Sequence, residues 1–394
     1  MADPGCIVAV RCQTLHMDTL IIRPGLQPHC SIVPPYLLVR LARVDDPRYA
    51  RAAAAARQSL LRDSQIRQSR SAAPEHPGAA ARALPARTPG NPDRTISDAG
   101  QVERLPGRQV RAEGQAAGTD PAVNEAYDSL GATNALFWNI FGRDGIDEKG
   151  LPLDATVHYG RSYDNAFWDG ERMVFGDGDG QVFNRFTISP SVIGHELTHG
   201  VTQFSANLEY QNQSGALNES ISDVFGALVE QHAWRQSTAE ASWLIGTGLF
   251  TDQVQGLALR SLKAPGTAYN DDVLGKDPQP DTMAGYLETE DDNGGVHLNS
   301  GIPNRAFYLV AETLGGNAWE TPGRIWYETL TGGGLHRQSD FAAFAAVTAE
   351  TAARLYGSGG AAHGAVLNAW ARVGVVLNPG TPTTPGRPDL DFSI

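Results

Sequence analysis

The chain has 394 residues, of which 41% are hydrophobic and 19% charged, and its formal net charge is −13. This length allows two or three domains with a sizeable core. Residues 1–100 carry a net charge of +5 and residues 101–394 a net charge of −18, and so acidic a body argues against nucleic acid as a partner. The sequence has no apolar run of about eighteen residues, so no membrane-spanning helix is expected.

The N-terminus, MADPGCIVAVRC, is a poor secretory signal, because an acidic residue stands where a basic one is expected and the apolar run is short. Met17 is an alternative start. Cys6, Cys12 and Cys30 are the only cysteines, so the rest of the chain needs no disulfide and has no cysteine metal site. The opposite charges of the N-terminal segment and the body favour contact between them, although separately solvated segments fit the charges equally well.

The first 94 residues are predicted to precede the compact body. Residues 1–70 contain one strongly apolar motif, SIVPPYLL (31–38), in which two prolines predict an extended stretch. An Ala- and Arg-rich helix is predicted over 47–70. Residues 71–94 are dense in Pro, Gly, Ala and Arg, which indicates a flexible linker.

The body is predicted to change from mixed α/β structure to helices. Short strands are predicted at 95–100, 105–111, 153–160 and 171–189, the last with GDGDG as a turn, and an amphipathic helix at 121–141. Further helices are predicted at 191–204 and 214–233 and from 301 to about 376, before a disordered tail at 378–394. This order predicts two lobes, 95–207 and 208–377, with a cleft between them.

His195, Glu196 and His199 form an HExxH motif inside a predicted helix. Histidines four residues apart share one face of a helix, so both imidazoles can reach a single ion. Glu196 lies beside them, where it can hold a metal-bound water without binding the metal. The alternative is a helix that carries these residues by chance.

The next predicted helix offers the remaining groups of a zinc site. A catalytic zinc needs a third protein ligand and an open position, and Glu219 is the candidate ligand. Asp223 and Asn218 are candidate acceptors for the outer N–H groups of His195 and His199 respectively. A solvated acidic helix face is the alternative, but the flanking residues are apolar, which favours buried carboxylates.

Four stretches, 165–180, 194–230, 259–266 and 291–302, resemble the thermolysin-like zinc metallopeptidases. The resemblance runs from about residue 95 to about 376. It implies an α+β, two-lobed fold, with a mixed α/β N-terminal lobe, a helical C-terminal lobe and the HExxH helix on the floor of the cleft. It also implies a neutral endopeptidase with one Zn²⁺ that acts on proteins or peptides.

The resemblance assigns a role to each site residue. His195, His199 and Glu219 bind zinc, and Glu196 is the base. Residues that stabilise the transition state are His297, oriented by Asp292, and Tyr210. Residues that bind substrate are Asn165 and Ala166 at the backbone, Arg260 beside the first primed-side pocket, and Phe183, Phe186, Val192 and Leu259 as its lining. Such a pocket predicts cleavage before bulky apolar residues.

Two departures point to the protealysin-like branch of that family. The positions that hold calcium in long-propeptide relatives are Ser191, Glu230, Ser242, Thr247 and Leu257, with a single carboxylate, so calcium binding is not expected. Fewer than a hundred residues precede the body, as in short-propeptide relatives.

The short N-terminal segment is predicted to be an intramolecular inhibitor. Residues 31–38 are expected to lie in the catalytic cleft, with Tyr36, Leu37 and Leu38 as the side chains for its apolar pocket. In a variant of this prediction the Cys30 thiolate binds the zinc; the alternative is a folding aid that never touches the cleft. The enzyme is expected to be a monomer that is secreted or exported, with cytoplasmic storage of the precursor as an alternative.

Two other functions compete with the endopeptidase. An aminopeptidase could use the same zinc set but would need carboxylates to hold a free amine, whereas Asn165 and Ala166 favour an endopeptidase. A zinc-binding pseudoenzyme would have lost the base or a ligand, whereas Glu196, Tyr210 and His297 are all present.

Overall fold

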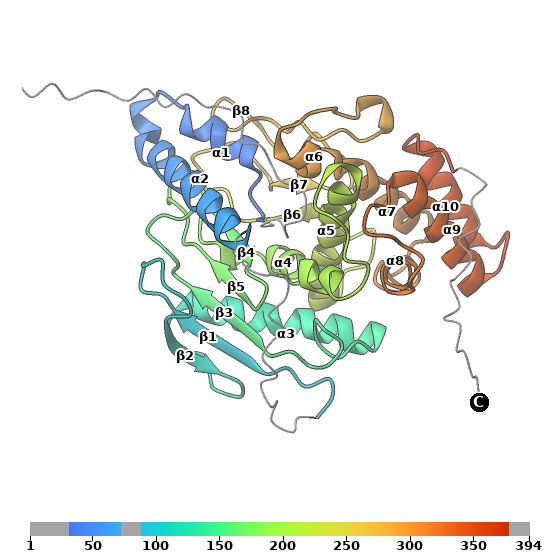
Figure 1. Ribbon diagram of the computed structural model, residues 1–394, viewed down its shortest axis with the longest axis horizontal. Coiled ribbons are helices and arrows are strands. Elements are labelled where there is room, and N and C mark those ends of the chain that lie inside the picture. The colour runs from blue at the N-terminus through green and yellow to red at the C-terminus, as the bar shows by residue number, and fades with distance from the viewer. Residues whose placement is uncertain (1–30, 72–87, 378–394) are drawn as a thin grey trace, which may run out of the picture.

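The computed structural model describes residues 31–71 and 88–377 (Figure 1). The expectations for Met17, the three cysteines, most of the linker and the tail at 378–394 concern residues outside these ranges. Among the described helices, none combines the length and the apolar character that crossing a membrane requires.

Residues 31–71, which the sequence predicts to be an inhibitory pro-segment and which keep that name below, form a short extended stretch, a 3₁₀ turn at Pro47–Tyr49 and two helices, α1 (Pro35–Ala42) and α2 (Ala50–Ser71). The predicted helix over 47–70 is confirmed. The predicted extended stretch is right at Pro34 but wrong from Pro35 onward, because a proline in the first turn of a helix needs no N–H partner. Helix α1 then buries Leu37, Leu38 and Leu41 against the body.

The first part of the body is built on a five-stranded sheet with the order β2-β1-β3-β5-β4. Its strands are β1 (Arg94–Asp98), β2 (Arg108–Ala112), β3 (Leu153–Val157), β4 (Ala166–Trp168) and β5 (Arg172–Phe175). The three central strands run parallel, and β2 and β4 pair antiparallel to them at the two edges. Strand β4 is therefore an edge strand of the sheet.

The predicted strand at 171–189 is only half right. Residues after the GDGDG turn make an isolated bridge between Phe183 and Phe250 and a short 3₁₀ turn at Phe186–Ile188. The Asp179 carboxylate accepts the N–H groups of Gln181 and Val182 and curls the chain away from β5.

Helices occupy the rest of the molecule. The amphipathic α3 (Pro121–Phe141) covers the sheet and packs against α4 (Pro190–Gln203), which packs against α5 (Asn212–Trp234) in the centre of the molecule (Figure 1). The C-terminal helices are α6 (Asp292–Asn299), α7 (Gly301–Leu314), α8 (Thr321–Thr331), α9 (Phe341–Tyr356) and α10 (Ala361–Arg372). Two small antiparallel strand pairs, β6 (Leu244–Ile245) with β7 (Arg260–Ser261) and β8 (Asn270–Asp271) with β9 (Gly275–Lys276), lie between α5 and α6 in the chain. The predicted two-part α+β architecture is confirmed.

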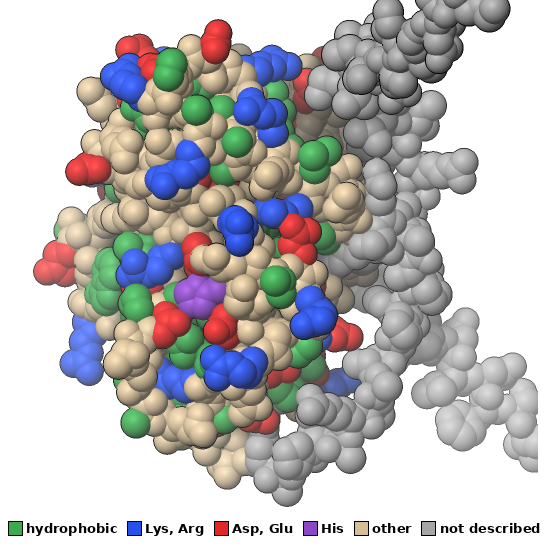
Figure 2. Space-filling model, turned by 90° about the vertical axis from the view of Figure 1, so that its left-hand side faces the viewer, with side chains coloured by type: hydrophobic (Ala, Val, Ile, Leu, Met, Phe, Trp, Pro, Cys, Tyr) green, Lys and Arg blue, Asp and Glu red, His purple; other side chains and the backbone are tan. Residues whose placement is uncertain are grey.

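The pro-segment packs on the body, which decides between the two interpretations of the charge asymmetry. Arg40 donates to the carbonyls of Asp272 and Val273 at 2.9 and 3.0 Å, and Arg62 pairs with Glu103 at 2.5 Å. On the face in Figure 2, Lys and Arg side chains are interspersed with Asp and Glu side chains rather than separated by sign. The pro-segment therefore contacts the body through single ion pairs and hydrogen bonds to backbone carbonyls, rather than through a basic surface that faces an acidic one.

Candidate active site

The site is built on two helices that approach each other closely. A Cβ atom on Gly226 of α5 would lie 2.4 Å from the Ser191 carbonyl oxygen of α4, so only glycine permits this contact. The close approach sets Glu219 against the histidine face of α4. His195 and Glu219 are fully buried, and His199 is 5% exposed.

Three ligand atoms converge at one point, and their spacing fits zinc. His195 Nε2 and His199 Nε2 are 3.0 Å apart, and each lies 3.4 Å from an oxygen of Glu219. Tetrahedral ligands about 2.0–2.1 Å from zinc stand roughly 3.3 Å apart. Glu219 Oε2 is buried without a hydrogen-bond partner among the described residues, as an oxygen facing an ion would be. Within the described ranges, no other group of three His, Cys, Asp or Glu side chains is arranged to hold a metal.

Neighbouring acceptors fix which nitrogen of each histidine is free. His195 Nδ1 lies 2.8 Å from Asp223 Oδ1, and His199 Nδ1 lies 2.8 Å from Asn218 Oδ1. An N–H on each Nδ1 leaves the Nε2 lone pair free for a metal. Burial also lowers the pKa of His199 to about 4 and keeps its imidazole neutral.

Asp223 is itself held in place by further groups. Arg260 forms a buried ion pair with it at 2.8 Å, and Asn304 Nδ2 donates to its Oδ2 at 2.9 Å. Burial alone would raise the pKa of Asp223, but Arg260 and His195 reverse this and lower it. The carboxylate therefore stays charged beside the ligand that it orients. Asn304 was not predicted, because an asparagine near the start of α7 carries no motif.

Glu196 is fully buried next to the ligands and does not belong to the metal group. Its Oε2 accepts the backbone N–H of Trp168 at 3.1 Å, while Oε1 has no hydrogen-bond partner in the described part of the chain. Burial raises the pKa of Glu196 well above its ordinary value, and the charge of Glu219 raises it further. This arrangement suits a group that takes and returns a proton. A main-chain partner such as Trp168 leaves no signal in a sequence.

Tyr210 and His297 reach the same point from the other side. Tyr210 Oη contacts Glu219 Oε1 and lies 3.1 Å from His297 Nε2. Asp292 binds His297 twice, at Nδ1 (2.6 Å) and at the backbone N–H (2.9 Å). Burial alone would lower the pKa of His297, but Asp292 and Glu219 reverse this and raise it to about 9. His297 is thereby kept as a proton donor aimed at the site.

Three of the predicted substrate-binding residues, Asn165, Ala166 and Arg260, bind the backbone of the pro-segment. Ile32 donates its N–H to the Ala166 carbonyl at 3.2 Å, and its carbonyl accepts from Arg260 at 2.9 Å. The Val33 N–H donates to Asn165 Oδ1 at 3.0 Å. The four predicted pocket residues are at most 1% exposed and belong, like Ile32, to the main hydrophobic core; they are Phe183, Phe186, Val192 and Leu259.

This register corrects the predicted pocket occupant. Ile32, and not Tyr36, Leu37 or Leu38, has its backbone bound by the residues assigned to substrate, because the chain enters α1 at Pro35. A second contact was missed by the sequence: Asp63 of α2 accepts from Asn165 Nδ2 at 3.0 Å and from Tyr163 Oη at 2.6 Å. The Ala- and Arg-rich stretch around Asp63 gave no sign of it.

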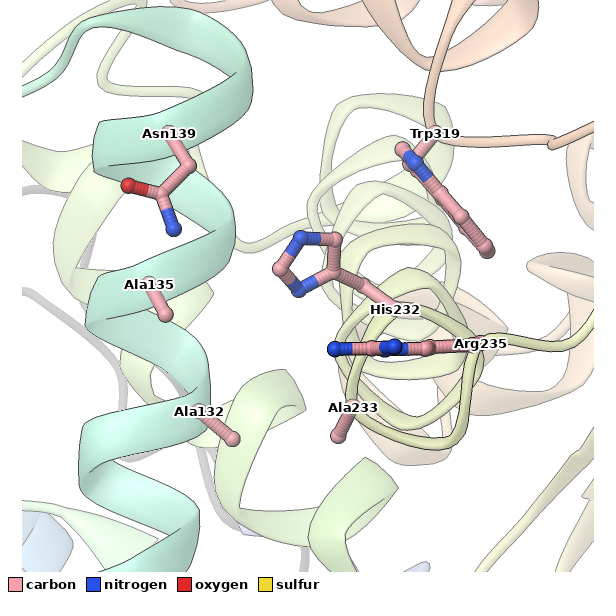
Figure 3. Close-up of a pocket in the computed structure, with 7 residues that line it drawn as sticks. All are labelled: Ala132, Ala135, Asn139, His232, Ala233, Arg235 and Trp319. Carbon is pink, nitrogen blue, oxygen red and sulfur yellow. The ribbon is translucent and has the colours of Figure 1, made fainter.

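A separate pocket of about 450 Å³ opens between α3 and the end of α5. Figure 3 shows Asn139, His232 and Arg235 around it, with Trp319 on its far side. None of the predicted site residues lines this pocket, so it is distinct from the metal centre.

Comparison with known proteins agrees with this geometry. Residues 92–203 match the family model described as the thermolysin metallopeptidase catalytic domain, and residues 206–375 match that of its alpha-helical domain. An extracellular metalloprotease of Pectobacterium carotovorum subsp. carotovorum is 50% identical over 89% of this chain and 97% of its own length. A thermolysin of Alicyclobacillus acidocaldarius subsp. acidocaldarius is 40% identical over 65% of this chain and 46% of its own.

A solved structure of a precursor aligns with most of the chain. The precursor of protealysin, a metalloproteinase from Serratia proteamaculans, aligns with a TM-score of 0.79 and 49% identity, over 88% of this chain and all of that one. Together with the His195, His199 and Glu219 group, these matches show that the chain belongs to the thermolysin family of metallopeptidases, in its protealysin-like branch, and is a zinc metalloendopeptidase.

Proposed function

We propose that this neutral metallopeptidase cleaves peptide bonds before bulky apolar residues and is made as a precursor that its own pro-segment inhibits. One observation carries the proposal: the residues with substrate-binding roles hold Ile32 and Val33 by their backbones. A peptide substrate would need the same hydrogen bonds, so enzyme and pro-segment compete for them.

In the proposed mechanism each residue of the site has one task. Asn165, Ala166 and Arg260 bind the substrate backbone. Glu196 takes a proton from water and passes it to the leaving amine. The chemistry that bound zinc supplies is Lewis acidity toward the water and the scissile carbonyl.

His297 and Tyr210 complete the proposed mechanism. Both offer donors on the side where negative charge develops. Asp292 keeps the outer nitrogen of His297 occupied, so its Nε2 N–H points into the site.

The preference for apolar residues rests on the pocket. Ring centroids of Phe183 and Phe186 are 5.6 Å apart, and both side chains are fully buried. Filling such a pocket with a Leu, Ile or Phe side chain contributes about 1.5–3 kcal/mol. An aminopeptidase is disfavoured, because Ala166 and Asn165 bind the backbone of an internal stretch of chain, at Ile32 and Val33, rather than a free N-terminus.

Other features of the biology remain proposals. Export is supported by relatives named as extracellular, and a monomer is the simplest state for a cleft enzyme. Independence from calcium is supported by Glu230, whose carboxyl interacts with the hydroxyls of Ser191 and Ser242 rather than with other carboxylates.

The test uses processed enzyme and a library of internally quenched peptides with blocked ends. We expect hydrolysis that a zinc chelator abolishes, with cuts before Leu, Ile or Phe. Adding a peptide of residues 26–44 should inhibit competitively, and the same peptide with Ile32→Asp should not. Cleavage only at free N-termini would contradict the proposal. Equal inhibition by the wild-type peptide and the Ile32→Asp peptide would also contradict it.

A further inference from the structure

The backbone of the pro-segment lies in the cleft in one defined register. The Ile32 N–H, the Ile32 carbonyl and the Val33 N–H each have a partner, namely Ala166, Arg260 and Asn165 respectively. Ser31 also pairs antiparallel with Phe167 next to these contacts. A slip by one residue would break all three hydrogen bonds and turn the buried Ile32 side chain outward.

This register identifies the peptide bond that faces the catalytic groups. Arg260 is assigned to the first primed-side pocket, which takes the residue that follows the scissile bond, and here Arg260 holds Ile32. The bond before it joins Ser31 to Ile32. The Ser31 carbonyl oxygen lies 3.1 Å from His297 Nε2, which is the donor assigned to the developing oxyanion.

The pro-segment thus runs through the cleft in the direction of a substrate and presents a peptide bond at the reacting position. We propose that Ser31–Ile32 is a self-cleavage site, which the precursor hydrolyses in its own cleft; this rests on the proposed function. The water oxygen bonds to the Ser31 carbonyl carbon, the C–N bond to Ile32 breaks, and Glu196 carries a water proton to the Ile32 nitrogen. The products are a Ser31 carboxylate and an Ile32 amine.

Cutting this bond does not release the pro-segment. Downstream contacts hold it far from the cut: Tyr49 Oη donates to the Gln253 carbonyl at 2.7 Å, and Tyr163 Oη donates to Asp63 at 2.6 Å. Helix α1 buries three leucines against the body. The new chain start at Ile32 stays on the primed side of the cleft, so trimming precedes activation and does not cause it.

The first experiment follows the chain itself by intact mass and N-terminal sequencing of freshly purified, zinc-loaded precursor. We expect a first-order conversion, independent of precursor concentration, to a chain that begins at Ile32, without a matching rise in hydrolysis of an added peptide. Precursor with Glu196→Gln should stay intact, because it lacks the base. It should also stay intact when mixed with wild-type precursor, because each molecule cuts only its own bond.

A matched pair of variants tests the register. Ile32→Asp puts a charge in the apolar pocket and should slow the cut by roughly tenfold to a hundredfold. Leu61→Asp makes the same change on the same pro-segment at a site that is 66% exposed, and the cut should proceed as in wild type. Hydrogen exchange on metal-free Glu196→Gln precursor tests the register without any cleavage. The Ile32 and Val33 amide hydrogens should exchange slowly with solvent, because both are hydrogen-bonded in the cleft.

The mature enzyme separates this inference from the proposed function. It should cut a peptide of residues 26–38 between Ser31 and Ile32. If it hydrolyses other peptides but leaves Ser31–Ile32 intact in both the peptide and the precursor, or cuts at another bond, the self-cleavage site is refuted and the proposed function stands. If it hydrolyses no peptide at all, the proposed function itself fails.

Discussion

At the scale of single residues, the metal centre depends on acceptors that lie behind the ligands. Asp223 and Asn218 take the Nδ1 hydrogens of the two histidines, so both Nε2 atoms face Glu219 without a proton. Removing the third ligand should therefore weaken zinc binding without disturbing the histidines.

We expect Glu219→Ala protein to retain well under one zinc per chain after dialysis, because two imidazoles alone hold the ion weakly. Metal analysis beside wild type checks this. Glu350→Ala, which removes an exposed carboxylate from α9, is the control and should keep full zinc. A full zinc content in the Glu219 variant would show that this residue is not a ligand.

Replacing the base should separate chemistry from metal binding. In Glu196→Gln protein the amide oxygen can still accept the Trp168 N–H but cannot take a proton. We expect the turnover number to fall by at least roughly a hundred- to ten-thousand-fold, with zinc content unchanged. Turnover near that of wild type would remove Glu196 from the mechanism.

The sequence predicted the side chains of this site better than their surroundings. HExxH spacing and the following carboxylate depend on helical periodicity, which local sequence encodes. The Trp168 N–H, by contrast, is a backbone group that almost every residue type has, so the sequence does not mark it. Asp63 meets Asn165 across 102 positions in the chain, and such a contact depends on the complete fold.

At the scale of elements, helix α2 supports the residue that binds the inhibitory stretch. Asp63 accepts hydrogen bonds from Tyr163 and Asn165, which are both donors. An asparagine amide in its place would present an N–H₂ group to one of these donors, and two donors cannot form a hydrogen bond with each other. A buried hydrogen bond that is not formed costs about 1–3 kcal/mol of stability.

Asp63→Asn should therefore loosen the pro-segment without altering the mature enzyme, which lacks that residue. We expect the isolated pro-segment to inhibit mature enzyme roughly tenfold more weakly, measured as an inhibition constant. Leu61→Ala on the exposed side of α2 is the control. Equal inhibition by Asp63→Asn and wild-type segments would mean that this contact contributes nothing to latency.

The junction of α4 and α5 contains a buried carboxyl. Glu230 is 3% exposed, and burial raises its pKa from 4.5 to about 7 against the opposing hydrogen bonds of Ser191 and Ser242. Below pH 4.5 it is protonated in both the folded and the unfolded chain. Between pH 4.5 and 7 only the unfolded chain ionises, so the free energy of unfolding falls as the pH rises.

Glu230→Gln should remove this pH dependence. In wild type the Glu230 carboxyl lowers the free energy of unfolding by about 3 kcal/mol between pH 4.5 and neutral pH. Urea unfolding at several pH values measures it, with the exposed Glu350→Gln as control. A variant whose stability falls with pH as steeply as that of wild type would contradict this assignment.

The elements that the sequence predicted well are those with a strong internal pattern. The amphipathic helix at 121–141 and the helices after residue 301 have apolar faces that local sequence reveals. The sequence failed at the start of α1, where Pro35 suits a first helical turn as well as an extended chain. It also failed after residue 176, where the Asp179 carboxylate accepts the N–H groups of Gln181 and Val182 in a local turn that interrupts the alternating strand pattern.

At the scale of the whole molecule, the fold should not depend on calcium. Of the five positions that would carry the ion in long-propeptide relatives, only Glu230 has a carboxylate, and a hard cation needs several oxygen ligands. We expect the melting temperature of the mature enzyme to be unchanged by a calcium-selective chelator. A large fall that added calcium restores would contradict this.

The edge position of β4 has a consequence for the targets of the mature enzyme. Once Ser31–Val33 has gone, the Ala166 carbonyl on the outer edge of β4 is open to any chain that can lie straight beside it, as Ile32 does in the precursor. A substrate helix cannot do so, because its own backbone groups are already paired. A folded protein should thus be digested at a rate set by how often a stretch of several residues opens, so that local unfolding, as much as the residue beside the cut, decides which proteins survive the enzyme.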